Sequence, residues 1–188
     1  MPLYQGKKNG EFESGDRCII QRRSDSVLYV MIDAVGHGVI ANKIADIAQN
    51  IIQNSERESL PNLIAACEVE LINTRGAVIF FAQFYPKSGK LHYYGVGNIR
   101  CYVLSRFYSR SLPSSPGILG RPAQKYDIQK VKIETPTSLL MFTDGLPEIK
   151  TQILPQLCKM TPRHIVGFLS ESWSETDDVC CFCEYMYE

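Results

Sequence analysis

Apolar residues along the first part of the chain follow the spacing of one strand and two helices. Residues 27–32 (VLYVMI) form a compact apolar run, which is typical of a buried strand. In residues 39–53, four isoleucines recur at intervals of three or four, and this spacing predicts an amphipathic helix. Residues 60–73 predict a second helix, with Pro61 tolerated in its first turn.

The pattern then changes to short apolar segments typical of strands. Pro86-Lys87-Ser88-Gly89 separates the first two and indicates a hairpin. One more helix is predicted over residues 162–173. The predicted strands cover 77–85, 90–97, 99–105, 126–134, 138–143 and 179–187. Hairpins combined with separate helices favour a layered α+β domain over a doubly wound parallel sheet.

The composition is typical of a globular protein and argues against nucleic-acid and membrane partners. The chain has 188 residues, 45% hydrophobic and 21% charged, with a formal net charge of zero, so we expect one globular domain over residues 1–188. Zero net charge and the lack of a basic cluster interleaved with aromatics argue against a nucleic-acid partner. The polar N-terminal segment and the absence of a long apolar run predict a cytoplasmic protein with no membrane partner.

The seven cysteines do not form an evident metal-binding motif. Cys180, Cys181 and Cys183 are close together, but they lie in a segment that alternates like a half-buried strand. Cys181 and Cys183 would then share one face and Cys180 the other. No second Cys/His pair stands at ligand spacing, so we expect buried, reduced thiols.

Acidic residues stand at three predicted strand ends. Asp33 ends the first apolar strand, Asp144 ends SLLMFT, and Asp177-Asp178 precedes the last strand. Carboxylates gathered at the edge of a sheet would raise each other's pKa unless a cation neutralised them. Oxygen ligands favour Mg²⁺ or Mn²⁺, and such ions activate water and hold a phosphoryl group. Each position also has a simpler interpretation: a helix cap for Asp33, a turn for Asp144-Gly145, and a solvated loop for Asp177-Asp178.

Four motifs occur in an order that resembles a known family. They are Ser14-Gly15-Asp16, Asp33-Ala34-Val35-Gly36-His37-Gly38, Phe142-Thr143-Asp144-Gly145-Leu146 and Asp177-Asp178-Val179. This order resembles the SpoIIE/RsbU/RsbX branch of the PPM-type serine/threonine phosphatases, and residues 75–104 and 117–129 look most like its single-domain members of the stress pathway. The likeness extends from Gly15 to Tyr185. Val78 and Cys180 stand where relatives often have threonine.

The resemblance implies a fold and a metal site. The fold would be an α-β-β-α sandwich of two antiparallel sheets flanked by helices. Asp33 would bridge two Mn²⁺ or Mg²⁺ ions, the Ala34 carbonyl would face the second ion, Asp144 and Asp177 would hold the first, and Asp16 would act through metal-bound water. A catalytic role for His37 is possible, but a helix-entry role fits better.

The resemblance also implies a substrate. It would be phosphoserine or phosphothreonine on a STAS-type signalling protein of the bacterial stress response. Selectivity would come from segment 105–127, where Arg121 and Lys125 are candidate substrate-binding residues. Arg106, Arg110, Phe107 and Tyr108 belong to the same segment, which a solvent-exposed flap would also explain.

Other expectations concern assembly and alternatives. We expect a monomer or weak dimer, and a domain that works without an attached sensor, because the first motif begins about fifteen residues into the chain. The alternative function is a catalytically weak, phosphatase-like binding or scaffold module. A nuclease or a small-molecule phosphatase would use the same metals. The absence of a basic groove from the sequence pattern argues against the nuclease.

Overall fold

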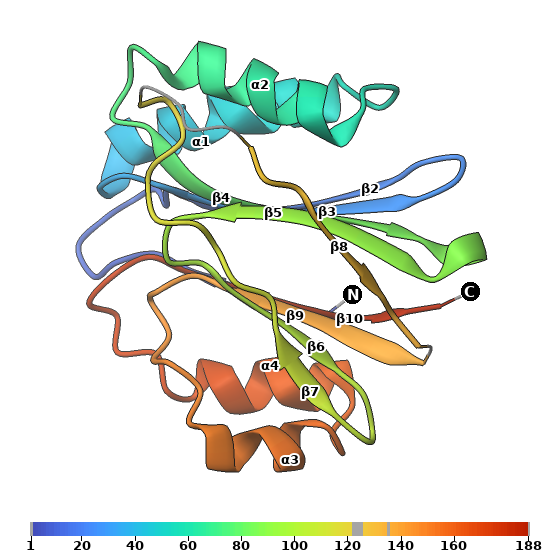
Figure 1. The fold of residues 1–188 in the computed structure, drawn as a ribbon. Helices are drawn as coiled ribbons and strands as arrows, with labels where there is room; N and C mark the ends of the chain where they lie inside the picture. Colours follow the sequence, from blue (N-terminus) through green and yellow to red (C-terminus); the bar gives the residue numbers. More distant parts are fainter. Residues whose placement is uncertain (1, 122–125, 135, 188) are drawn as a thin grey trace.

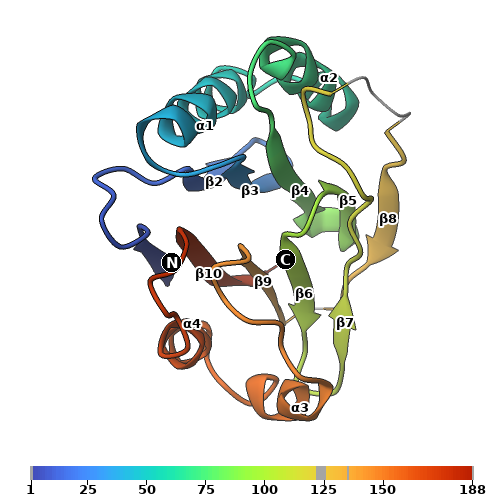
Figure 2. The ribbon, with the colours of Figure 1, turned by 90° about the vertical axis from the view of Figure 1, so that its left-hand side faces the viewer.

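Two five-stranded antiparallel sheets lie face to face, and helices cover both outer faces (Figure 1). The computed structural model describes residues 2–121, 126–134 and 136–187. One sheet has the strand order β2-β3-β4-β5-β8 and is covered by α1 and α2, whereas the other has the order β1-β10-β9-β6-β7 and is covered by α3 and α4 (Figure 2). The expected α-β-β-α sandwich is therefore confirmed.

The elements follow the predicted pattern closely. The strands are β1 Leu3–Gly6, β2 Asp16–Arg22, β3 Val27–Ala34, β4 Ala77–Tyr85, β5 Lys90–Val96, β6 Arg100–Leu104, β7 Ser109–Ser111, β8 Gln129–Lys132, β9 Thr137–Phe142 and β10 Val179–Met186. The helices are α1 Gly38–Gln53, α2 Leu60–Leu71, α3 Leu154–Leu157 and α4 Pro162–Ser170, with short 3₁₀ turns at Pro86–Ser88 and Thr151–Ile153.

The apolar pattern did not reveal four of these elements. They are β1, β2, β7 and α3, which are short or carry mixed polar and apolar residues. Three of them, β1, β2 and β7, are edge strands, and an edge strand needs less apolar sequence because it has one neighbour. Strand β8 is also shorter than the predicted 126–134.

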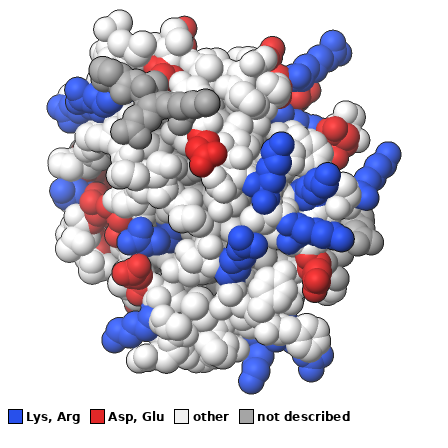
Figure 3. All heavy atoms as spheres, in the orientation of Figure 1, with Lys and Arg blue, Asp and Glu red and all other residues white. Residues whose placement is uncertain are grey.

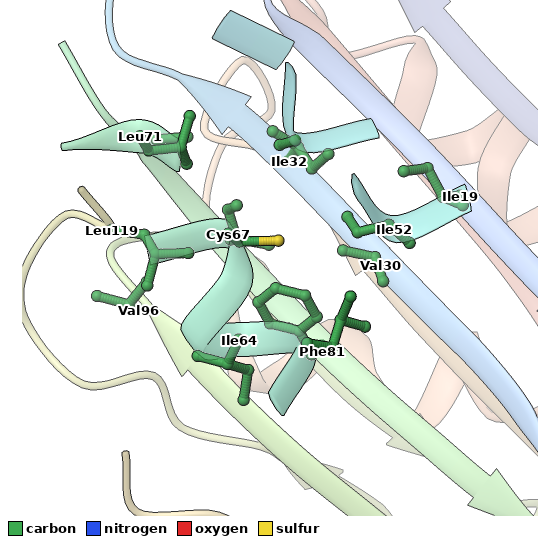
Figure 4. Close-up of a cluster of buried hydrophobic side chains, with 14 of the residues drawn as sticks. Ile19, Val30, Ile32, Ile52, Ile64, Cys67, Leu71, Phe81, Val96 and Leu119 are labelled. Carbon is green, nitrogen blue, oxygen red and sulfur yellow. The ribbon is translucent and has the colours of Figure 1, made fainter. Parts of the chain in front are cut away.

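The core has three layers that match the sandwich. Figure 4 shows part of the layer between the first sheet and α1 and α2, with Ile32, Ile64 and Phe81 among its buried side chains. A second layer fills the space between the sheets, and there Tyr29 of β3 stacks on Phe182 of β10 with ring centroids 5.9 Å apart. A third lies between the second sheet and α3 and α4.

The predicted burial of the cysteines is confirmed for five of the seven, whereas Cys18 and Cys158 are partly exposed. Cys180 points into the space between the sheets, while Cys181 and Cys183 point toward α3 and α4. All seven thiols are free, and burial raises the pKa of the Cys183 thiol to about 12. In the part of the chain that the structure describes, no helix is long and apolar enough to cross a bilayer.

The fold gathers lysines on a face where the linear sequence shows no cluster. Lys130 and Lys132 of the edge strand β8 lie opposite His92 and Lys90 of β5. Figure 3 shows Lys and Arg side chains spread over this face of the molecule. Charged residues on an exposed edge strand prevent pairing with another sheet, which explains the lysines of β8 without a ligand.

Candidate active site

A cleft of about 440 Å³ opens at the edge where the two sheets face each other. Asp33, Asp144 and Asp177 all line it, although they lie far apart in the sequence. Asp33 belongs to β3 of the first sheet, Asp144 follows β9 of the second, and Asp177 precedes β10. The structure thus brings the three predicted strand-end carboxylates to one place.

The turn after β3 positions Asp33 and explains the glycines that follow it. The chain turns at Gly36, with φ 107°, and α1 begins at Gly38, with φ 66°. These left-handed conformations favour glycine. The residue that caps α1 is His37, and its side chain makes no capping hydrogen bond. A helix-cap role for Asp33 is therefore wrong, because Asp33 lies within the strand.

His37 occupies the helix entry. Its Nδ1 lies 2.5 Å from Oε1 of Glu11, so it ties the N-terminal loop to the turn before α1. A Cβ built on Gly38 would lie 2.3 Å from Oε2 of the same glutamate, a flexible side chain that can move, so the preference for glycine there comes from its φ of 66°. His37 lines the cleft as well.

Asp16 lies behind the cleft and joins the two sheets. It is opposite Asp33 in the β2–β3 register and only 2% exposed. The Thr143 hydroxyl donates to Asp16 Oδ2 at 2.6 Å, and the same oxygen of Thr143 accepts from the Cys180 N–H at 2.8 Å. The contact fixes the strand end that carries Asp144 against the strand pair that carries Asp33.

Neighbours hold the other two acids in place. Asn98 Nδ2, in the turn between β5 and β6, donates to Asp144 Oδ2 at 2.7 Å. Asp177 Oδ1 accepts from the N–H of Asp178, and the Asp177 carbonyl accepts from Trp173 Nε1 at 3.0 Å. Sequence reasoning did not single out Asn98, because an amide in a turn signals a site only once its partner is known.

Asp178 anchors the N-terminal loop. Its carboxylate accepts from the backbone N–H groups of Lys8 at 2.9 Å and Gly15 at 2.7 Å. These bonds place Lys8 on the wall of the cleft. The sequence analysis missed Lys8, since it stands outside every motif. Ala34 is fully buried and does not line the cleft, so its carbonyl role stays a prediction.

The electrostatics of the cleft match a cation site. Burial, then the charges of Asp144, Asp177 and Asp178, raise the pKa of Asp33 to about 8. Burial, then the charge of Asp33, raises the pKa of Asp16 well above its usual range. Burial, then Asp177, also raises the pKa of Asp144, against the effect of the Asn98 hydrogen bond.

The donor set fits a hard divalent cation. Asp33, Asp144 and Asp177 supply carboxylate oxygens to the cleft, and these are the donors that Mg²⁺ and Mn²⁺ prefer. Within residues 2–121, 126–134 and 136–187, no three His, Cys, Asp or Glu side chains are already close enough to enclose an ion. The acids line the cleft and would have to converge to share a metal.

The structure divides the predicted docking segment 105–127. Gly117 and Ile118 line the cleft, and the exposed Arg121 follows three residues later. Arg106 and Phe107, in contrast, follow the far end of β6, because β6 leads away from Asn98 and pairs at Leu104 with the start of β9. Segment 105–127 therefore lies only partly beside the cleft, and its docking role stays a prediction. Lys125 lies outside the described residues.

The layered fold and the acids at the sheet edge are those of the PPM-type phosphatases. The family model of stage II sporulation protein E (SpoIIE) matches residues 23–165, which is more than half of the chain, so the chain belongs to the SpoIIE family of these phosphatases. It is an enzyme of the phosphoprotein phosphatase class.

Individual relatives agree with this assignment. Phosphoserine phosphatase RsbX of Bacillus subtilis (strain 168) is 27% identical over 157 residues, covering 80% of this chain and 77% of the relative. The crystal structure of RsbX in complex with magnesium superposes with a TM-score of 0.87 at 22% identity, over 97% of this chain and 92% of that one. A solved chain described under the heading "The bacterial stressosome: a modular system that has been adapted to control secondary messenger signaling" gives a TM-score of 0.85 at 27% identity, over 97% of this chain and 96% of that one.

Proposed function

We propose that the chain hydrolyses phosphoserine or phosphothreonine on a partner protein with the help of two bound Mn²⁺ or Mg²⁺ ions. The observation that carries this proposal is the meeting of Asp33, Asp144 and Asp177, from strand ends of two different sheets, in one cleft. The raised pKa of Asp33 supports it, because carboxylates in this arrangement need a cation to remain charged together at neutral pH.

The roles proposed for the residues are those that the resemblance to the PPM-type phosphatases implies. Asp33 would bridge the two ions, Asp144 and Asp177 would hold the first, and the Ala34 carbonyl would face the second. Asn98 orients the Asp144 carboxylate, and the Thr143–Asp16 hydrogen bond keeps the two acidic strand ends in register across the sheets. The bound ions would supply an activated water and neutralise the charge of the phosphoryl group.

Removal of the bridging carboxylate tests the proposal. Asp33→Asn should lower the turnover of an aryl phosphate by at least about a hundredfold, on the order of 3 kcal/mol, and weaken Mn²⁺ binding measured by calorimetry. The matched control is Asp127→Asn, at an exposed aspartate whose only described side-chain partner is Gln129. EDTA-treated wild-type protein should be equally inactive.

Either of two results would contradict this proposal. One is turnover by EDTA-treated protein at the untreated rate. The other is Mn²⁺ binding without release of phosphate from any phosphoserine substrate, which would favour the phosphatase-like binding or scaffold module.

We further propose that the substrate is a phosphorylated STAS-type protein in the cytoplasm, and that residues 1–188 act as one phosphatase domain, as a monomer or weak dimer. The likeness to a stressosome chain and to phosphoserine phosphatase RsbX supports this substrate class. The surface beside the cleft also suits a protein. Phe12, Val39 and Ile40, which we call the apolar lip, are 89%, 51% and 52% exposed and flank the Glu11–His37 pair.

Two variants separate protein docking from phosphate chemistry. Phe12→Ser in the apolar lip and Arg121→Ala should lower turnover of a phosphorylated STAS protein about tenfold, while hydrolysis of the aryl phosphate stays unchanged. Ile72→Ser, at a similarly exposed residue just beyond α2, is the control. Equal loss on both substrates would assign the residues to the phosphate itself, and loss on neither would rule out their docking role.

A further inference from the structure

A second hollow, of about 550 Å³, lies between the β6–β7 turn and the helices α3 and α4. Figure 1 shows this turn beside α3, on the outer side of the second sheet. Leu104 at the end of β6, Leu157 of α3 and Ile165 of α4 form its apolar floor, and each is at most 4% exposed. We call this hollow the α3 groove.

A rigid turn holds an aromatic side chain in solvent at the rim of the α3 groove. Phe107 is 90% exposed. The Ser105 N–H donates to the Tyr108 carbonyl at 2.8 Å, and the Phe107 N–H donates to Ser105 Oγ at 3.4 Å. These bonds close the turn and fix the backbone at Phe107, which places the base of its side chain at the rim. Exposed aromatics beside a hollow are typical anchors of protein interfaces.

The charged residues of the rim are all cationic. Arg106 and Lys159 line the α3 groove, and no described Asp or Glu does. Neither cation forms an ion pair within 4 Å with a described carboxylate. The neighbouring hollow shares Lys159 and continues the surface along α4 with Arg163, the partly exposed Phe168 and one acidic residue, Glu171. The two hollows together form a surface strip with more basic than acidic side chains and an apolar floor.

We propose that the α3 groove binds an acidic segment of a partner protein through an apolar anchor residue. Charge complementarity favours an acidic segment, because Arg106 and Lys159 line the groove without an ion pair to a described carboxylate. The apolar floor and the exposed Phe107 favour an apolar anchor residue within that segment. The site is separate from the catalytic cleft. The first residue of β6, Arg100, pairs with Phe142, two residues before Asp144. The last, Leu104, lines the α3 groove and pairs with Ser138 at the other end of β9. A partner can therefore dock here while the cleft stays open.

The test uses a short fluorescent peptide with a leucine and a phenylalanine flanked by glutamates, and a copy in which lysines replace the glutamates. Fluorescence anisotropy should show binding of the acidic peptide alone, weaker at higher salt. Phe107→Ser and Lys159→Glu should each reduce its affinity about tenfold. The matched control is Phe12→Ser, because Phe12 is 89% exposed but lies on the apolar lip.

Several outcomes would overturn the proposal. These are equal binding of both peptides, no binding of either, or binding that neither variant changes. If the protein bound phosphatidylglycerol vesicles through Phe107 and did not bind the peptide, the partner would be a membrane surface. If Phe107→Ser changed the sedimentation coefficient of the protein, the partner would be a second copy of the chain. Melting curves check that each variant folds. Aryl phosphate turnover should be unchanged in Phe107→Ser, so failure here is distinct from failure of the proposed catalytic function.

Discussion

Lys8 is the cation that the fold places on the wall of an acidic cleft. Its backbone N–H is fixed by Asp178, and no described carboxylate lies within ion-pair distance of its ammonium group. An ammonium group that forms no ion pair with a described carboxylate is available to an incoming phosphate dianion. The neighbouring Lys7 donates to the Phe12 carbonyl at 3.1 Å and does not line the cleft.

This difference between two adjacent lysines gives a prediction. Lys8→Met should raise KM for an aryl phosphate and weaken inhibition by inorganic phosphate about tenfold each, with kcat less affected, because one charge-assisted contact is worth roughly 1.5–3 kcal/mol. Lys7→Met should change neither. A change in Mn²⁺ affinity without a change in phosphate affinity would instead show that Lys8 acts on the acids alone.

The pKa of Asp33 predicts how the stability of the metal-free protein depends on pH. Folding raises this pKa from an ordinary value of about 3.9 to about 8, so the folded state binds more protons between these values. Stability from this group is complete below about pH 4 and is lost as pH rises toward 8. The slope is at most about 1.4 kcal/mol per pH unit.

Melting of EDTA-treated protein across this pH range checks the sign. The melting temperature of Asp33→Asn should fall less steeply with rising pH than that of the wild type, because the asparagine does not titrate. Parallel curves for the two proteins would mean that Asp33 titrates normally in the folded chain.

At the scale of elements, the site depends on where strands end and how they turn. The β5–β6 turn carries Asn98, and the residue before it, Gly97, has φ 94°. A Cβ on Gly97 would lie 2.0 Å from Cγ1 of Val78, which is on β4 and also lines the cleft. The turn therefore has no room for a side chain.

Gly97→Ala should lower the free energy of unfolding by more than the roughly 1 kcal/mol that the left-handed conformation alone costs. Turnover should fall too, because Asn98 would be displaced from Asp144. Gly10→Ala is the control: its φ is 87°, but a Cβ there would meet no atom within 4 Å. Urea unfolding that gives equal losses for both variants would show that contact with Val78 does not matter.

At the scale of the whole molecule, the packing of one sheet on the other sets the width of the cleft. Asp33 belongs to one sheet, and Asp144 and Asp177 flank strands of the other. Phe182 is fully buried between the sheets against Tyr29, whereas Phe81 is fully buried between the first sheet and its helices.

Phe182→Leu and Phe81→Leu should destabilise the protein to a similar extent, about 1–2 kcal/mol each, because both remove a buried ring. Only Phe182→Leu should weaken Mn²⁺ binding, since it alone loosens the contact that sets the distance between the facing acids. If both variants bound Mn²⁺ equally weakly in calorimetry well below the melting temperature, the loss would come from the lower overall stability and not from the contact between the sheets.

The sequence by itself determined most of the helices and strands and the acidic strand ends. The 3.6-residue spacing of isoleucines identified α1, and the apolar runs before Asp33 and Asp144 placed these acids at strand ends. Both signals are local, because burial of one face of an element imposes a period on neighbouring residues.

Only the tertiary structure decided which residues share a site. Asn98 and Lys8 reach the cleft through hydrogen bonds to Asp144 and Asp178, more than forty and more than a hundred residues away in the chain. Phe107 belongs to the predicted docking segment but lies away from the cleft, because β6 leads the chain to the far end of the sheet. Strand pairing and sheet packing join distant segments, and no period in the local sequence records which segments those are.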